Sequence, residues 1–513
     1  MGNTASRVAI NTGYLYLRMG ISMFISLFTT RLILQSLGAE DFGIYNVVGG
    51  AIYMLGFLSA AMADPTQRFM SYYEGRGDKD GIKKVFNITI IMNICVSALV
   101  LVLFIVAGFW LFGGILNINE DRVFAAQIVY ASLVISTVFS VISTPYGAVL
   151  NAHENMRYYA FVGIFESVLK LLVAIWVVYT STDKLILYGI LMAFIPIICF
   201  VIMLVYCNKK YEECVYDPKQ YWDSGIAKDT LSFAGWSFVF SSLSMVGSHG
   251  LGIVLNHFYG AVLNAAQGIS SQVNSLLLTL SKNLQKAVSP VITKREGAGE
   301  RNSMISITIS TSKLSFYLFS FFSIPIFFEA SYILDLWLKD VPEWAVAFVR
   351  LQIIQNLLLQ ITMNFSVAIA AEGHIKWYNI TTSIMWVLPL IFTSLLFNCG
   401  YGPLAMYYLT LVCLGVGINI LNVYYFHRNC GMSYGVFIKE LLMQVLIVTI
   451  VQVLTVFLLT QLLESSFLRL VLTTISCIGV GCLAVYYIGV NESEKQLIDN
   501  LIGKISKRLF SKA

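Results

Sequence analysis

Ionised side chains inside long apolar segments are the residues of this sequence whose types and positions could do chemistry. A charge at the centre of a bilayer costs at least about 2.5 to 3.5 kcal/mol, so a charged residue there usually serves a substrate or an ion. Four such residues lie deep in apolar segments: Arg18, Glu166, Lys170 and Lys313. Together with Arg350 they leave the membrane interior with a net charge of +3, which predicts a site for an anion.

The position of each charge leaves more than one interpretation open. Glu166 and Lys170 are one helical turn apart and can pair on one face. They form either a neutralised structural pair or a functional one in which Glu166 serves a coupling ion. Arg31, Lys282 and Arg350 lie nearer the ends of their segments, where a long side chain can reach the headgroups. For these three residues, a side chain solvated at the headgroups and a side chain with a functional role are equally good interpretations.

Uncharged polar side chains form two rows at helical spacing. The first row is Asn264, Gln267, Ser271 and Asn274, and the second is Gln352, Asn356, Gln360 and Asn364. Spacings of three and four place each row on one helix face, which in hydrocarbon must meet protein or water. Amides also bridge packed helices. We favour a wet passage, because rows of four exceed what one packing contact requires. Amides and hydroxyls also suit a sugar-like group.

The elements that position these residues are membrane helices. Of 513 residues, 58% are hydrophobic and 12% are charged, against about 25% charged in a soluble protein, which excludes a soluble globular enzyme. Fourteen segments, among them residues 42–63 and 262–285, reach the roughly 20 apolar residues that span a bilayer as a helix. The predicted fold is therefore all-α, a polytopic integral membrane protein with about 14 transmembrane helices.

The charges in the connections predict the orientation. Basic residues concentrate in alternate loops, 23 on one side against 4 on the other. The positive-inside rule then places both termini in the cytoplasm. The net charge of +5 therefore reflects topology and does not indicate a nucleic-acid partner.

An internal repeat predicts the domain organisation. Shifting residues 13–78 by 222 positions aligns Gly38 with Gly260 and the turn 74–78 with 296–300. Duplication is the favoured interpretation, and shared composition is the alternative. The expected organisation follows the chain in this order: an N-terminal six-helix lobe at 1–206, a cytoplasmic linker at 207–229, a pseudo-symmetric six-helix lobe at 230–430, two accessory helices at 431–490 and a cytoplasmic amphipathic tail at 491–513.

Signatures of catalysis are missing from the sequence. The nine cysteines are scattered without a CxxC pair, and we find no metal-ligand spacing, no Ser/His/Asp arrangement and no phosphate-binding loop. We therefore expect no enzyme, no cofactor and no metal.

The segment RLILQSLGAEDFGIYNVVGG at 31–50 provides a resemblance to a known family. Its turn Leu37-Gly38-x-x-x-Phe42-Gly43-Ile44-Tyr45, with spans arranged as six, six and two, resembles the polysaccharide (O-antigen type) flippases of the multidrug/oligosaccharidyl-lipid/polysaccharide (MOP) exporter superfamily. The resemblance implies alternating access in the bacterial cytoplasmic membrane, with an undecaprenyl-diphosphate-linked oligosaccharide carried from the inner to the outer leaflet.

The same resemblance implies site residues and partners. The diphosphate or acidic sugars would meet the basic side chains Arg18, Arg31, Lys170, Lys313 and Arg350. The partners would be the lipid-linked oligosaccharide, membrane lipids and polysaccharide polymerase machinery. Two alternatives stay open. One is a cation-coupled drug or metabolite antiporter of the same superfamily, and the other is a membrane polysaccharide polymerase, disfavoured by the short outer loops.

Overall fold

A computed structural model of the protein describes residues 2–54, 57–115, 118–338, 340–492, 494–496 and 499. Over these residues the regular structure is entirely helical, which confirms the predicted fold class. The predicted tail at 491–513 lies outside the described residues except for 491, 492, 494–496 and 499. The chain divides into two compact units. The N-terminal unit is Ile10–Ser241, and the C-terminal unit runs from Ser242 onward together with the first nine residues.

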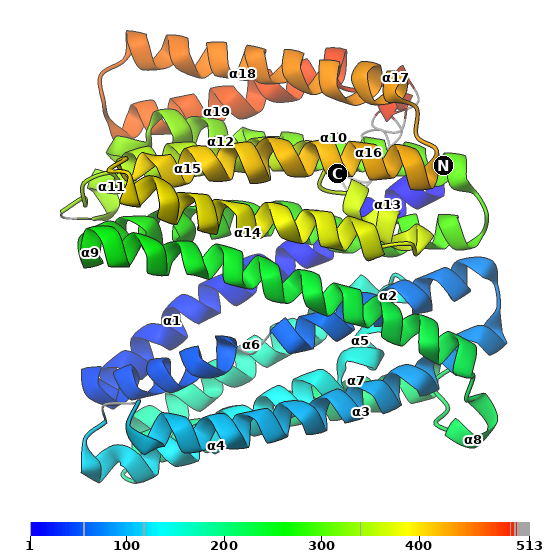
Figure 1. Ribbon diagram of the computed structural model, residues 1–513, viewed down its shortest axis with the longest axis vertical. Coiled ribbons are helices and arrows are strands. Elements are labelled where there is room, and N and C mark those ends of the chain that lie inside the picture. The colour runs from blue at the N-terminus through cyan, green and yellow to red at the C-terminus, as the bar shows by residue number, and fades with distance from the viewer. Residues whose placement is uncertain are drawn as a thin grey trace, which may run out of the picture. The chain divides into compact units, whose positions relative to one another are not determined.

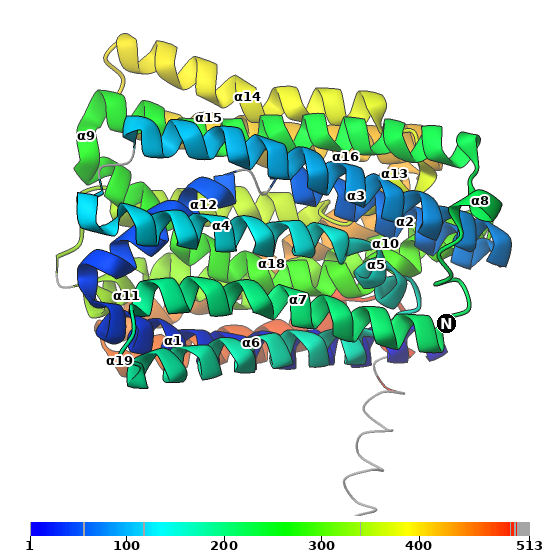
Figure 2. The ribbon, with the colours of Figure 1, turned by 90° about the horizontal axis from the view of Figure 1, so that it is seen from below.

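The N-terminal unit consists of long helices and short connections (Figure 1). Its elements are α1 (Gly2–Met54), α2 (Phe57–Arg76), α3 (Lys79–Trp110) with the π-helical turn η1 (Leu111–Ile115), α4 (Glu120–Ile142), α5 (Thr144–Ala152), α6 (Met156–Tyr179), α7 (Lys184–Lys210), α8 (Pro218–Tyr221) and the beginning of α9 (Ser224–Gly297). Helix α4 packs against α3 and α7 around buried Phe104, Val129 and Leu185 (Figure 2).

The C-terminal unit repeats this plan and adds a helical hairpin. It contains the rest of α9, α10 (Arg301–Phe328), α11 (Ala330–Trp337), α12 (Ala345–Ile361), α13 (Phe365–Glu372), α14 (Lys376–Asn398), α15 (Leu404–Thr410), η2 (Leu411–Gly417), α16 (Ile418–Cys430), α17 (Tyr434–Val436), η3 (Phe437–Leu442), α18 (Met443–Leu462), α19 (Phe467–Ala484) and η4 (Val485–Gly489). Helices α18 and α19 pair with each other and pack on α10.

The outward faces of the helices are apolar. On α3, Leu99, Val102 and Val106 follow one another at helical spacing, and each is about half exposed. Such a stripe is unfavourable in water and favourable in lipid. Eleven helices of the described residues are long and apolar enough to cross a membrane, or twelve with the pair α12 and α13, which bends by 43°. The chain is therefore a multi-pass membrane protein.

This count differs from the fourteen predicted spans for two reasons. The predicted span at 42–63 runs through residues 55–56, which lie outside the described part of the chain. The predicted span at 262–285 is helical, but it is absent from the eleven because its polar row lowers its hydropathy.

The predicted repeat appears in the backbone. Gly38 has φ 78° and ψ 173°, and Gly260 has φ 78° and ψ −173°, so α1 and α9 break at equivalent positions in the same way. This region is essentially restricted to glycine. Gly77 and Gly299 also share a positive φ, 73° and 75°. All four glycines obey the offset of 222 that the sequence predicts.

Hydrogen bonds repeat as well, with the offset of 222 in the turns and, in the cores, with an offset of 222 for the acceptor and 223 for the donor. The amides of Gly77 and Gly299 donate to the carbonyls of Glu74 and Glu296 at 3.1 and 3.0 Å. In the cores, the Cys207 thiol donates to the Tyr146 carbonyl at 3.8 Å, and the Cys430 thiol donates to the Ala368 carbonyl at 3.7 Å. Both units therefore preserve the same turns and the same helix contacts, as expected from a duplication.

We expect Gly38→Ala and Gly260→Ala each to lower the free energy of unfolding by about 1 to 3 kcal/mol, because an added side chain strains this backbone conformation. Gly235→Ala, in an open helical position, is the matched control and should be neutral or slightly stabilising. Unfolding of the purified protein in detergent measures the effect. Equal stability of all three variants would contradict the assignment of the breaks.

Candidate functional site

Arg18 of α1 lies half-buried in the N-terminal unit against one face of α6. The carbon of its guanidinium is 4.8 Å from the centre of the Tyr159 ring, a cation–π contact. One turn along α6, Gly163 leaves the space that the guanidinium fills, because a Cβ there would overlap Arg18. The glycine and the tyrosine together fix the position of the charge.

Glu166 and Lys170 lie further along the same helix and form the expected pair. The Lys170 Nζ is 2.6 Å from the Glu166 Oε1, and both side chains stay partly exposed. Between them on α6, the Ser167 hydroxyl donates to the Ser22 hydroxyl of α1 at 2.8 Å, so the two helices remain in contact here. We call Arg18, Glu166 and Lys170 the α1–α6 charge cluster. It has two positive charges and one negative charge, so one positive charge is left for an anion.

Lys313 lies in a closed environment in the C-terminal unit. Its side chain is 2% exposed, and its Nζ donates to the Glu494 Oε2 at 2.6 Å and to the Gln444 Oε1 at 2.9 Å. Asn491 completes the network, since Gln444 donates to its side chain and its backbone amide donates to Glu494, both at 2.7 Å. This charge therefore joins α10 to α18 and to the segment that follows η4.

The other two predicted basic residues, Arg350 and Arg31, have different surroundings. Arg350 donates through Nε to the Phe327 carbonyl at 3.1 Å, near the beginning of α12, and lines an open groove. Arg31 is exposed and makes no hydrogen bond or ion pair with another described residue.

The two polar rows contact each other. Asn356 of α12 donates to the Asn274 Oδ1 of α9 at 2.7 Å, and Ser270 donates to Gln352 between the same helices. Asn356 and Gln360 are almost fully buried. These hydrogen bonds hold α9 against α12, so the two rows contribute to helix packing, the alternative interpretation of their spacing.

The rest of the first row lies beside the break at Gly260. Asn264 and Gln267 contact Gly252, which lies before the break, while Ser271 is exposed. The side-chain oxygens of Gln267 and Gln360 are buried without a partner among the described residues, so each can still accept a hydrogen bond.

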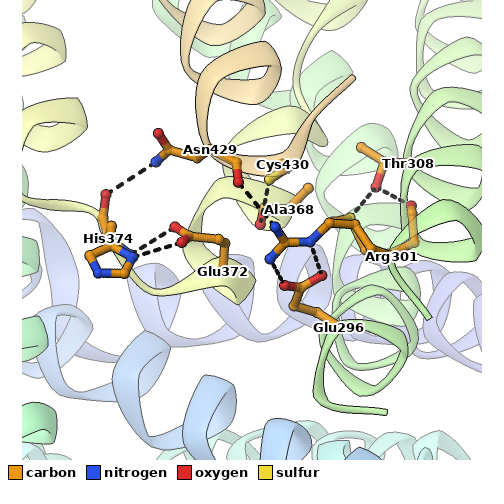
Figure 3. Close-up of polar contacts among 9 residues, drawn as sticks. Glu296, Arg301, Thr308, Ala368, Glu372, His374, Asn429 and Cys430 are labelled. Carbon is orange, nitrogen blue, oxygen red and sulfur yellow. Dashed lines mark hydrogen bonds and ion pairs between the residues drawn. The ribbon is translucent and has the colours of Figure 1, made fainter. Parts of the chain in front are cut away.

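A polar network closes the end of the C-terminal unit that carries the 296–300 turn (Figure 3). Arg301 pairs with Glu296 and donates to the Asn429 carbonyl at 3.3 Å. Asn429 donates to the His374 carbonyl at 3.4 Å, and the His374 Nδ1 lies 2.7 Å from the Glu372 carboxylate. The network joins α9, α10, α13 and α16.

The N-terminal unit has a matching cluster with different chemistry. His153 lies 3.3 Å from Glu74, pairs with Glu213 and stacks on Tyr211 with 4.3 Å between ring centres. Burial opposes protonation of this histidine, but the hydrogen bonds that its ring donates to the Glu213 and Glu74 carboxylates outweigh burial and raise the pKa of His153 to about 9. Glu74 and Glu296 are equivalent in the repeat, so one lobe pairs this position with a histidine and the other with an arginine.

Sequence reasoning missed these two clusters and the partner of Lys313. The alignment of Glu74 with Glu296 was the available signal for the clusters, whereas Glu494 lies 181 residues from Lys313 and no local pattern joins them. Among the described residues no group of three or more His, Cys, Asp or Glu side chains could hold a metal ion.

Comparisons with known proteins define the class. The MatE family model matches residues 17–176. An outward-facing multidrug resistance MATE family transporter of the MOP superfamily has a similar fold, with a TM-score of 0.73 at 13% identity over 83% of this chain and 96% of that chain. MATE in a straight conformation gives 0.72 at 13% identity over 83% and 96%.

A MOP superfamily transporter from Pyrococcus furiosus, described as having a binding pocket of reversed polarity that suggests a different function, also gives a TM-score of 0.72 at 13% identity over 84% and 97%. No protein of curated function matches the sequence. Residues 17–176 are therefore similar to the MatE family, and the chain has the fold of the solved MATE transporters.

Lys313→Met should lower the free energy of unfolding by about 3 to 5 kcal/mol, because it leaves the Glu494 charge buried without its partner. The double variant Lys313→Met, Glu494→Gln should have a higher free energy of unfolding than Lys313→Met alone. The control Lys439→Met removes an exposed lysine and should keep the wild-type value. Unfolding in mixed micelles measures all three. A Lys313→Met protein of normal stability would instead favour a direct role in substrate binding.

His153 should make stability depend on pH. Its folded-state pKa of about 9 exceeds the ordinary value of 6.5, so its stabilising charge is fully present below pH 6.5 and is lost as the pH rises through 9. The melting temperature of wild type should exceed that of His153→Gln at about pH 6, and the difference should disappear by about pH 10. The control, His374→Gln at a largely exposed ring, should keep the wild-type profile. Parallel curves for wild type and His153→Gln would refute the role of the charge.

Proposed function

We propose that this protein is a flippase that moves an undecaprenyl-diphosphate-linked oligosaccharide, a repeat unit of a polysaccharide or lipopolysaccharide, from the inner to the outer leaflet of the bacterial cytoplasmic membrane. Alternating access of a MATE-type fold provides the route, with both termini in the cytoplasm. The observation that supports this proposal most directly is the α1–α6 charge cluster, whose excess positive charge suits a diphosphate.

The geometry of the cluster fits an anion that must bind and then leave. Arg18 is fixed on Tyr159, but no carboxylate is bonded to its guanidinium in the contacts described. Lys170 shares its charge with Glu166 and remains partly exposed. A guanidinium is suited to bidentate recognition of phosphate, whereas a fully neutralised pair would have no charge left to offer.

The polarity of a binding pocket selects between anionic and cationic substrates, because a like charge in the pocket repels the substrate. The reversed polarity described for the Pyrococcus furiosus relative is linked there to a different function. A positive cluster in this chain supports an anionic substrate by the same reasoning. Polysaccharide polymerase machinery is then the expected consumer of the flipped product.

A second candidate is a cation-coupled drug or metabolite antiporter. The MatE match at 17–176 and the fold of a multidrug resistance transporter favour it, and Glu166 is the carboxylate that could serve the coupling cation. The two functions predict opposite charge preferences for the substrate, so one assay separates them.

Translocation of a labelled undecaprenyl-diphosphate oligosaccharide in proteoliposomes, beside efflux of a cationic dye, tests the proposal. We expect wild type to move the lipid, and Arg18→Ala to reduce the rate tenfold or more, about the effect of one lost charge-assisted hydrogen bond. Arg18→Lys should retain part of the rate, and Lys219→Ala, at an exposed residue of the linker, should retain all of it.

Gly163→Ala gives a second way to disturb the same charge. The added methyl group displaces the end of a flexible arginine, so the fold should survive while the guanidinium leaves the Tyr159 ring and transport falls as in Arg18→Ala. Gly147→Ala, where a methyl group meets open space, is its matched control. Normal transport by both Arg18→Ala and Gly163→Ala would refute the site, and dye efflux without lipid transport would establish the antiporter.

A further inference from the structure

The C-terminal unit has a groove at its predicted outer end, separate from the polar network of Figure 3. Its volume is about 550 Å³, and it lies between the ends of α10 and α15 and the first two turns of α12. Charged and aromatic side chains meet at one part of it, and aliphatic side chains form the rest.

The charged part of the groove holds one cation and one anion that do not pair with each other. Arg350 is fixed by the bond from its Nε to the Phe327 carbonyl, and its guanidinium lies 5.8 Å from the centre of the Phe327 ring. Its two terminal nitrogens make no hydrogen bond with another described residue. Glu343 lines the same groove, is exposed, and forms no ion pair with Arg350 or with another described residue.

The aliphatic part is a track along two helices. Ala347, Leu351 and Ile354 follow one another at spacings of four and three on α12, so they share one face. Leu404 lines the groove from α15, one turn before Tyr408. The α12 face covers about two turns, or roughly 11 Å, which accommodates the upper part of an acyl chain.

Trp344 marks the depth of the groove in the membrane. It precedes the first residue of α12 with φ 72°, a left-handed conformation that a bulky residue rarely adopts and that occurs at ligand sites. Its indole and the Tyr408 ring both line the groove. Tryptophan and tyrosine are enriched at the headgroup level of a bilayer, and an indole face also attracts an ammonium group.

We propose that this groove binds a zwitterionic phospholipid of the outer leaflet, of the phosphatidylethanolamine class. Arg350 binds the phosphate, Glu343 and the Trp344 ring bind the ammonium group, and an acyl chain lies along Leu351 and Ile354. A lipid diphosphate would leave Glu343 facing like charge, and a cationic drug would leave Arg350 facing like charge. Only a ligand with both charges satisfies both residues.

Native mass spectrometry of the full-length protein in detergent tests this assignment. The probes are phosphatidylethanolamine and phosphatidylglycerol with identical acyl chains, added in equal amounts. Wild type should retain the ethanolamine lipid about tenfold over the glycerol lipid, the effect of one charge-assisted contact. Glu343→Gln should abolish this preference, and Glu464→Gln, at an exposed glutamate in the loop between α18 and α19, should preserve it.

A second variant tests the acyl track without changing a charge. Ile354→Trp fills the groove and should reduce retention of both lipids about equally, while the melting temperature confirms that the variant is folded. Equal retention of the two lipids by wild type, or an unchanged preference in Glu343→Gln, would overturn the proposal. Tighter binding of undecaprenyl phosphate than of the ethanolamine lipid, unaffected by Glu343→Gln, would also overturn it and would assign the groove to a lipid phosphate without an amine.

Discussion

The absence of water in the hydrocarbon region is the constraint on which this structure depends. Each backbone polar group there must find its partner inside the protein, and a continuous helix does this within one segment. The breaks at Gly38 and Gly260 interrupt this ladder of hydrogen bonds at the predicted outer turns. Every charge placed between the ends of a helix then needs a partner, a ring or access to water.

The two units meet this requirement in different ways. In the N-terminal unit, Arg18 rests on an aromatic ring, and the Glu166–Lys170 pair remains partly exposed. In the C-terminal unit, Lys313 is enclosed and bonded on two sides. The first arrangement keeps charge available for a ligand, and the second uses charge to join helices. A count of buried charges does not distinguish the two arrangements, although only the charges in the N-terminal unit remain accessible to an anion.

The repeat preserves backbone geometry more strictly than it preserves chemistry. Equivalent glycines have nearly identical φ values, and Cys207 and Cys430 make equivalent bonds to carbonyl oxygens. At the equivalent glutamates the partners have diverged to His153 and Arg301. A histidine can lose its proton as the pH rises and an arginine cannot, so at this repeated position only the pair of Glu74 with His153 can respond to pH. Duplicated turns thus act as a scaffold on which each lobe has acquired its own polar groups.

Much of the fold is encoded locally and was predictable from the sequence. Apolar length defines membrane helices, the offset of 222 locates the equivalent turns, and a four-residue spacing brings Glu166 to Lys170. The neighbours of each charge depend on which helices pack together, and this only the tertiary structure decided. It placed Glu494 against Lys313, set Asn274 against Asn356 and put Gly163 beneath Arg18. Spacing along one helix is a local property, whereas contacts between helices far apart in the sequence follow from the packing of all of them together.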